Sequence, residues 1–183
     1  SSLATAPDGA QAELWARLAH LAIGSIPAVV FHLNAATAGQ LRERRRAIGI
    51  HYAVAGGVTL LCVATPWVLA EPRQYAWGWY PSYTWVGVAP TAFLAVTLAE
   101  VLWIYRRAIR RVESGSTHRE TLRAIHAGNA LAALTLIDFL PLWGIAVYPP
   151  GYLVLTGLQV ANLYGTLRDR MVDIPPPLAA EEI

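Results

Sequence analysis

Two carboxylates are the first residues in this chain that could do chemistry. Asp138 lies in LTLIDFLPLWG and Glu100 lies in LAEVLWIYRR, both within apolar stretches. Ionisable side chains inside a membrane are costly, so they mark candidate functional positions. Glu100 has a structural explanation, because Arg107 follows on nearly the same helical face and the two could pair at the interface. Asp138 has no basic residue within two turns, so we expect it to bond to a hydroxyl or amide on another helix, to stay protonated, or to contact a ligand.

The other polar groups in apolar stretches are mainly histidines and amides. With Glu100, we take His51, His126 and Asn129 as the intramembrane polar residues. Pairs drawn from His32, His51 and His126 have similar expected depths, so a haem site is a minor alternative. His126 and Asp138 are about 18 Å apart along one helix, which makes them separate sites. The amides predicted to bond between helices are Asn34, Asn129, Gln159 and Asn162.

Other kinds of site find no support in the sequence. The single cysteine, Cys62, lies in an apolar run, where it is expected to be a small buried residue; it permits no internal disulfide and no thiolate metal cluster. There is no phosphate-binding glycine loop, nucleophile elbow or pair of catalytic carboxylates. We therefore predict no catalytic residue, no metal site, no cofactor, no nucleic-acid partner and no enzymatic activity.

The elements that position these residues are predicted to be membrane helices. The chain is 55% hydrophobic and only 14% charged, whereas soluble domains carry about 25% charged residues. A membrane-spanning helix needs about 20 mostly apolar residues. Five stretches qualify or come close: Trp15–Ala36, Ile48–Leu69, Tyr83–Tyr105, Leu122–Trp143 and the shorter Tyr152–Leu167. The predicted fold is an all-α polytopic bundle over residues 13–174, after a polar segment (1–12) and before a proline-rich acidic tail (175–183).

Arginines and tryptophans predict the orientation. Twelve of the fourteen arginines fall in QLRERRR, in the connector after the third helix, or just after the fifth helix. Arginine-rich connectors face the cytoplasm, so the N-terminus is expected outside and the C-terminus inside. Six of the seven tryptophans fall at the opposite ends, which suits the interfacial preference of the indole ring. The outer loop EPRQYAWGWYPSYTW is expected to lie on the membrane surface or to cap the bundle.

The last two predicted helices carry a recognisable pattern. A basic connector, Arg119 to Arg123, leads into the small-residue-rich helix HAGNALAAL, and Asp138 with flanking leucines follows. After these come the YPPG turn and an exit that reads RDRMVDI. This segment resembles the end of the seven-helix N-terminal sensor region of bacterial histidine kinases. WARLAHLAIGSIPAVVFHL and WGWYPSY resemble earlier parts of the same region, so the resemblance covers roughly residues 13–174.

The resemblance implies a non-catalytic sensor and signal-transducing module in a bacterial inner membrane. Its ligand site is expected around Asp138, with Trp143, Trp79 and Tyr80 from the outer rim. Relative to that family, the first two helices and the kinase part are missing, so the chain alone is not expected to phosphorylate anything. The alternative is an accessory or scaffolding subunit of a larger respiratory or photosynthetic complex. Either way, the expected partners are membrane lipids and other membrane chains, as a homodimer or in a larger complex.

Overall fold

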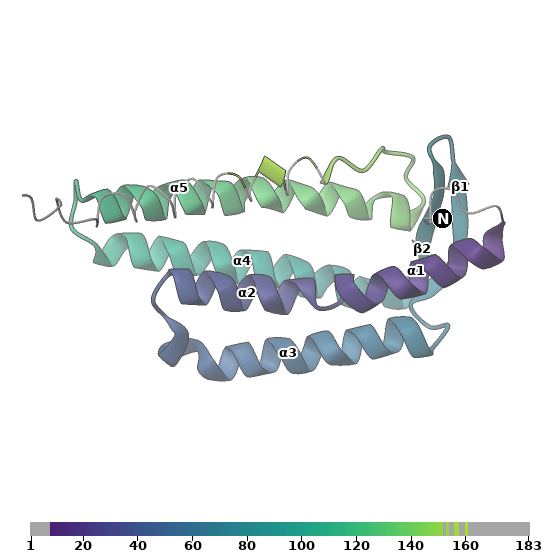
Figure 1. Ribbon diagram of the computed structural model, residues 1–183, viewed down its shortest axis with the longest axis horizontal. Helices are drawn as coiled ribbons and strands as arrows, with labels where there is room; N and C mark the ends of the chain where they lie inside the picture. Colours follow the sequence, from purple (N-terminus) through teal and green to yellow (C-terminus); the bar gives the residue numbers. More distant parts are fainter. Residues whose placement is uncertain (1–7, 152, 154–155, 158–159, 161–183) are drawn as a thin grey trace, which may run out of the picture.

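The chain is built mainly from helices that run side by side (Figure 1). This computed structural model describes residues 8–151, 153, 156–157 and 160. The α-helices are α1 (Gly9–Ile23), α2 (Ile26–Thr37), α3 (Leu41–Ala64), α4 (Val88–Arg111) and α5 (Thr117–Ala132). The short 3-10 helices are η2 (Trp85–Gly87), η3 (Ala133–Phe139) and η4 (Pro141–Trp143).

Within the described residues, four helical stretches are long and apolar enough to cross a membrane. They are Gly9–Thr37, Leu41–Ala64, Trp85–Arg111 and Thr117–Trp143. The multi-pass helical prediction is confirmed to this extent. Most of the fifth predicted helix (152–167) lies outside the described residues, although Gly151, Leu153, Thr156, Gly157 and Val160 are helical. The count of five and the orientation stay predictions.

The first span is broken into two helices, α1 and α2, at the proline expected to kink or end a helix. Pro27 stands in the first turn of α2, and it has no N–H to donate to the carbonyl four residues earlier. The chain bends at Gly24 and Ser25. A Cβ on Gly24 would collide with the Thr59 hydroxyl, so glycine allows this elbow to lie directly on α3.

The loop between the second and third predicted helices is an antiparallel hairpin of β1 (Leu69–Tyr75) and β2 (Gly78–Tyr83). The all-α prediction is therefore wrong in detail. Aromatic residues suit strands, and Gly78 takes a positive φ of 119° at the turn. The register shifts between Ala70 and Arg73, where Pro72 has no N–H for the ladder.

Several predicted helix ends also need correction. α3 begins at Leu41 rather than Ile48, so the arginines of QLRERRR form its first turns instead of a connector. α3 ends at Ala64 because Thr65 is extended before Pro66. α4 continues to Arg111, six residues past the predicted end. The fourth span keeps α-helical form only to Ala132 and continues as η3 and η4.

Two clusters of buried residues hold the bundle together. The first joins α2, α4 and α5 through Phe31, Val101, Ile104, Tyr105, Ala108, Leu122 and Ile125. The second joins the end of α3 to the hairpin and η4 through Cys62, Val68, Leu69, Tyr83 and Leu142. Cys62 is buried as predicted. The hairpin lies at one end of the bundle, opposite the arginine-rich ends of α3 and α4 (Figure 1).

Candidate functional site

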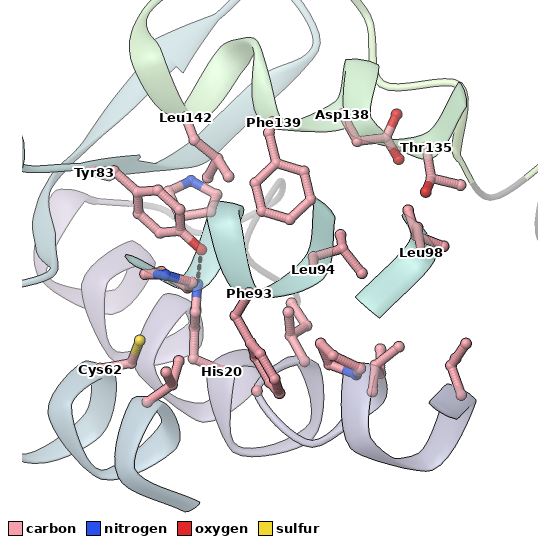
Figure 2. Close-up of a pocket in the computed structure, with 18 of the residues that line it drawn as sticks. His20, Cys62, Tyr83, Phe93, Leu94, Leu98, Thr135, Asp138, Phe139 and Leu142 are labelled. Atoms are coloured by element: carbon pink, nitrogen blue, oxygen red, sulfur yellow. Dashed lines mark hydrogen bonds between the residues drawn. The ribbon is translucent and has the colours of Figure 1, made fainter. Parts of the chain in front are cut away.

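A cavity of about 280 Å³ lies beneath the hairpin, among the α1–α2 elbow, α3, α4 and η3. Its walls are mostly apolar; Phe93 and Leu94 of α4 face Phe139 of η3 across it (Figure 2). Figure 2 places polar groups at two separate edges, with His20 and Tyr83 at one and Asp138 and Thr135 at the other. A mostly apolar pocket with a few placed polar groups is the usual form of a small-molecule site.

The first polar edge is a hydrogen-bonded pair with a defined proton arrangement. Nδ1 of buried His20 lies 2.7 Å from the carbonyl oxygen of Ala16, and its Nε2 lies 3.0 Å from the Tyr83 hydroxyl. A carbonyl oxygen only accepts, so Nδ1 carries the hydrogen and the Tyr83 hydroxyl donates to Nε2 of the neutral imidazole. Burial raises the pKa of Tyr83, which keeps its hydroxyl protonated. Its remaining lone pair can accept a hydrogen bond from a ligand.

The second polar edge links the cavity to the following chain segment. Asp138 lines the cavity, and its Oδ1 accepts the backbone N–H of Gly151 at 2.8 Å. A Cβ on Gly151 would collide with the Asp138 carboxylate, so only glycine allows this approach. The carboxylate thus binds the N–H of Gly151, the last residue of YPPG and the first helical residue there, where negative charge is favourable.

Tyr80 of β2 connects the hairpin to Asp138 of η3. Its hydroxyl donates to the backbone oxygen of Asp138 at 3.0 Å. Burial, with a smaller contribution from the Asp138 charge, raises the pKa of Tyr80 to about 12. β2, η3 and Gly151 are therefore connected through one residue, Asp138.

The four predicted ligand-site residues are only partly together. Asp138 and Tyr80 line the cavity. Trp143 does not line the cavity but packs against Tyr83, which does. The two ring centres are 6.1 Å apart and the rings are nearly perpendicular. Trp79 pairs with Gln74 in the hairpin and lies over the start of α1, at Gly9, outside the cavity lining. Ligand binding by these residues stays a prediction.

His51 and Glu100 form a pair between α3 and α4. Nδ1 of His51 lies 2.9 Å from the Ala47 carbonyl oxygen, and its Nε2 lies 3.2 Å from Oε2 of Glu100. The imidazole also stacks on Phe31 at 3.9 Å between ring centres. The expected pairing of Glu100 with Arg107 is wrong, because His51 takes that place.

Asn129 bonds between helices as predicted. It is buried on α5 and donates to the side-chain oxygen of Asn34 on α2 at 3.0 Å, and also to the carbonyl oxygen of Ile125. Gln159 and Asn162, the other two predicted amides, lie outside the described residues. His126 lies near Arg106, away from the cavity lining, and its Nδ1 is buried with no partner in the described part of the chain.

The haem alternative gains no support from the histidine geometry. Both nitrogens of His51 face other groups, so ligating a metal would displace Ala47 or Glu100. Nδ1 of His32 lies 3.2 Å from the Tyr52 hydroxyl. Among the described residues, no three side chains of the His, Cys, Asp or Glu type are grouped to hold a metal ion.

Sequence reasoning missed His20 and Tyr83 as parts of the site. Alternation along WGWYPSY was a usable signal for a strand, and a strand places Tyr83 on one face of the hairpin. The elbow that brings His20 to the cavity needed Pro27 to be read as a helix start. No family model, curated protein or solved structure matches this chain.

Proposed function

We propose that this chain is a non-catalytic sensor module of a bacterial inner membrane, of the type found ahead of histidine kinases. Its stimulus is a small, mostly apolar molecule held in the cavity beneath the hairpin. The observation that carries this proposal is the double role of Asp138, which lines the cavity and binds the Gly151 N–H. Through this bond Asp138 joins the cavity to the end of the YPPG turn.

The cavity chemistry limits the ligand class. Phe93, Leu94 and Phe139 favour an apolar ring or short chain, because burying apolar surface contributes about 25 cal/mol per Å². Tyr83 at one edge of the cavity and Asp138 at the other can accept hydrogen bonds from a ligand. The best fit is a compact apolar molecule with a hydroxyl or amine at one end.

Signalling requires two arrangements that the ligand binds unequally. In the first, Asp138 holds Gly151 as observed. In the second, a ligand donor takes the carboxylate and frees the Gly151 N–H, so that the following segment shifts. The exit residues Arg168 to Ile174 and the proline run 175–177, which would carry the shift toward the cytoplasm, lie outside the described residues.

The test is to fill the cavity. Leu94→Trp should occupy it, whereas Val96→Trp on the same helix places an equal side chain on an exposed position. Apolar molecules extracted from each purified protein would be identified by mass spectrometry. The proposal expects one compound to be retained by the wild type and Val96→Trp and lost from Leu94→Trp. Equal retention by a folded Leu94→Trp, or no compound beyond bulk lipid in the wild type, would refute it.

The accessory-subunit alternative is favoured by a different observation. On α3, Gly49, Ala53 and Gly57 are exposed and follow each other every four residues, with open space at both glycines. Small residues allow close approach of another helix. Gly57→Cys in a Cys62→Ala background should then form a disulfide in native membranes. A product of twice the chain mass indicates a homodimer, and a product with another chain indicates a larger complex.

A further inference from the structure

A basic hollow surrounds Trp103 at the end of the bundle away from the hairpin. It has a volume of about 400 Å³ and is lined by Trp103, Arg106, Arg107 and Arg110 of α4. Arg44 reaches the same indole from the first turns of α3. Two helices therefore bring guanidinium groups to one aromatic ring.

The ring holds two of these cations in place. The guanidinium carbon of Arg44 lies 4.6 Å from the centre of the Trp103 ring, and that of Arg107 lies 5.3 Å from it. Such cation–π contacts are attractive even at exposed positions. Trp103 is 48% exposed, so the hollow is open to its surroundings.

In the described part of the chain, no carboxylate pairs with the arginines of this hollow. Glu43, on the same turns of α3, pairs instead with Arg111, with 3.7 Å between the charged atoms. Among the described residues, no ion pair joins a carboxylate to Arg44, Arg106, Arg107 or Arg110. Four unpaired guanidinium groups around one hollow favour an anion with several oxygens, and guanidinium groups bind phosphate oxygens in pairs.

We propose that this hollow binds the phosphate headgroup of an anionic phospholipid. A lipid is favoured over a soluble phosphate as the ligand, because the basic hollow continues into an apolar face of α4. Exposed Val96, Ala99 and Trp103 follow each other at helical spacing along α4 and lead to Arg106 and Arg107. An acyl chain can lie along this face while the phosphate meets the arginines. The positive-inside rule would place this lipid in the cytoplasmic leaflet.

The experiment is a lipid titration of the purified full chain in detergent, followed by native mass spectrometry. The probes are phosphatidylglycerol and phosphatidylcholine with identical acyl chains. The variants are Arg44→Gln, Arg107→Gln and their double. The matched control is Arg45→Gln, which removes an exposed neighbouring arginine of α3 outside the hollow.

We expect one phosphatidylglycerol to bind the wild type and the control with the same affinity, and phosphatidylcholine to bind more weakly. Each single variant should weaken phosphatidylglycerol binding about five-fold, and the double variant more. Equal binding of both lipids, or an equal loss in Arg45→Gln, would overturn the proposal. Displacement of the lipid by an equal concentration of glycerol 3-phosphate would also overturn it, since the ligand would then be a soluble phosphate. If the double variant does not fold, the test rests on lipid binding by the single variants and by Arg107→Lys. The lysine keeps the charge but lacks the planar guanidinium group.

Discussion

Nε2 of His51 lies 3.2 Å from Oε2 of Glu100, while Nδ1 of the same ring faces the Ala47 carbonyl oxygen. That carbonyl takes Nδ1, so Nε2 is the ring atom left to face the carboxylate. The two atoms are within ion-pair distance but are not aligned as a hydrogen bond. The pair joins α3 to α4 inside two candidate membrane spans, where polar groups are costly without a partner.

Replacing Glu100 tests this pair. Glu100→Leu leaves Nε2 of His51 buried without a partner and should lower the free energy of unfolding by about 1–3 kcal/mol. Glu100→Gln should cost less, because its amide can donate to Nε2. Denaturant titration in detergent micelles measures both. Glu43→Gln is the control, since its pair with Arg111 is exposed and should contribute less than about 1 kcal/mol. A Glu100→Leu protein as stable as Glu100→Gln would contradict a stabilising His51–Glu100 pair.

The Asn34–Asn129 hydrogen bond should show energetic coupling between α2 and α5. Side-chain hydrogen bonds between membrane helices contribute about 0.6 kcal/mol on average and up to about 1.7. A double-mutant cycle with Asn34→Ala and Asn129→Ala should give a coupling free energy in that range. A parallel cycle with Asn34→Ala and Thr97→Ala, a buried threonine bonded within its own helix, should give a value near zero. Equal coupling in the two cycles would mean that the Asn34–Asn129 bond is not specific.

The close approach of Asp138 to Gly151 predicts a rescue. Gly151→Ala should destabilise the protein because its Cβ meets the carboxylate. In an Asp138→Ala background the same change should cost much less, since the obstacle is gone. Thermal unfolding of the four proteins measures this. A Gly151→Ala cost that is unchanged without the carboxylate would show that the clash lies elsewhere.

The Asp138–Gly151 contact also predicts that the Gly151 amide exchanges its hydrogen faster when the carboxylate is removed. Asp138→Ala removes the acceptor of the Gly151 N–H, so peptides that cover Gly151 should exchange faster by mass spectrometry. Peptides from α3 should be unchanged in the same sample. Protection at Gly151 equal to that of the wild type would remove the structural basis of the proposed signal path.

Alkaline pH should weaken the fold through Tyr80. An unfolded tyrosine ionises with a pKa of about 10, whereas the pKa of Tyr80 in the folded protein is about 12. The unfolded state therefore loses its proton first, and stability falls as the pH rises from about 10 to 12. Tyr80→Phe should be less stable at pH 8, because it lacks the bond to the Asp138 oxygen. Its stability should fall less steeply over that window, and equal slopes would contradict the raised pKa.

The sequence was sufficient to locate the apolar spans, because helix length and hydropathy are local properties. It also identified Asp138 and Asn129 as polar groups that would find partners, since an unpaired polar group is costly among apolar helices. The hairpin was missed because EPRQYAWGWYPSYTW was read through its aromatic content alone. The cavity could not be predicted, because its lining comes from elements far apart in the chain, such as His20 and Phe139. The pairing of Glu100 with His51 rather than Arg107 likewise depends on how α3 lies against α4.

The elbow at Gly24 and Ser25 bears on how the protein enters the membrane. α1 has 15 residues and α2 has 12, which at about 1.5 Å per residue gives lengths near 22 and 18 Å. Neither half alone crosses a hydrocarbon core of about 30 Å. The two halves are therefore expected to insert as one unit, with their junction, where Pro27 cannot donate to the Ile23 carbonyl, sheltered from lipid. Because Gly24 lies against Thr59 of α3, that shelter is complete only after α3 has been synthesised. The first crossing is thus expected to become stable in the bilayer after the second has joined it.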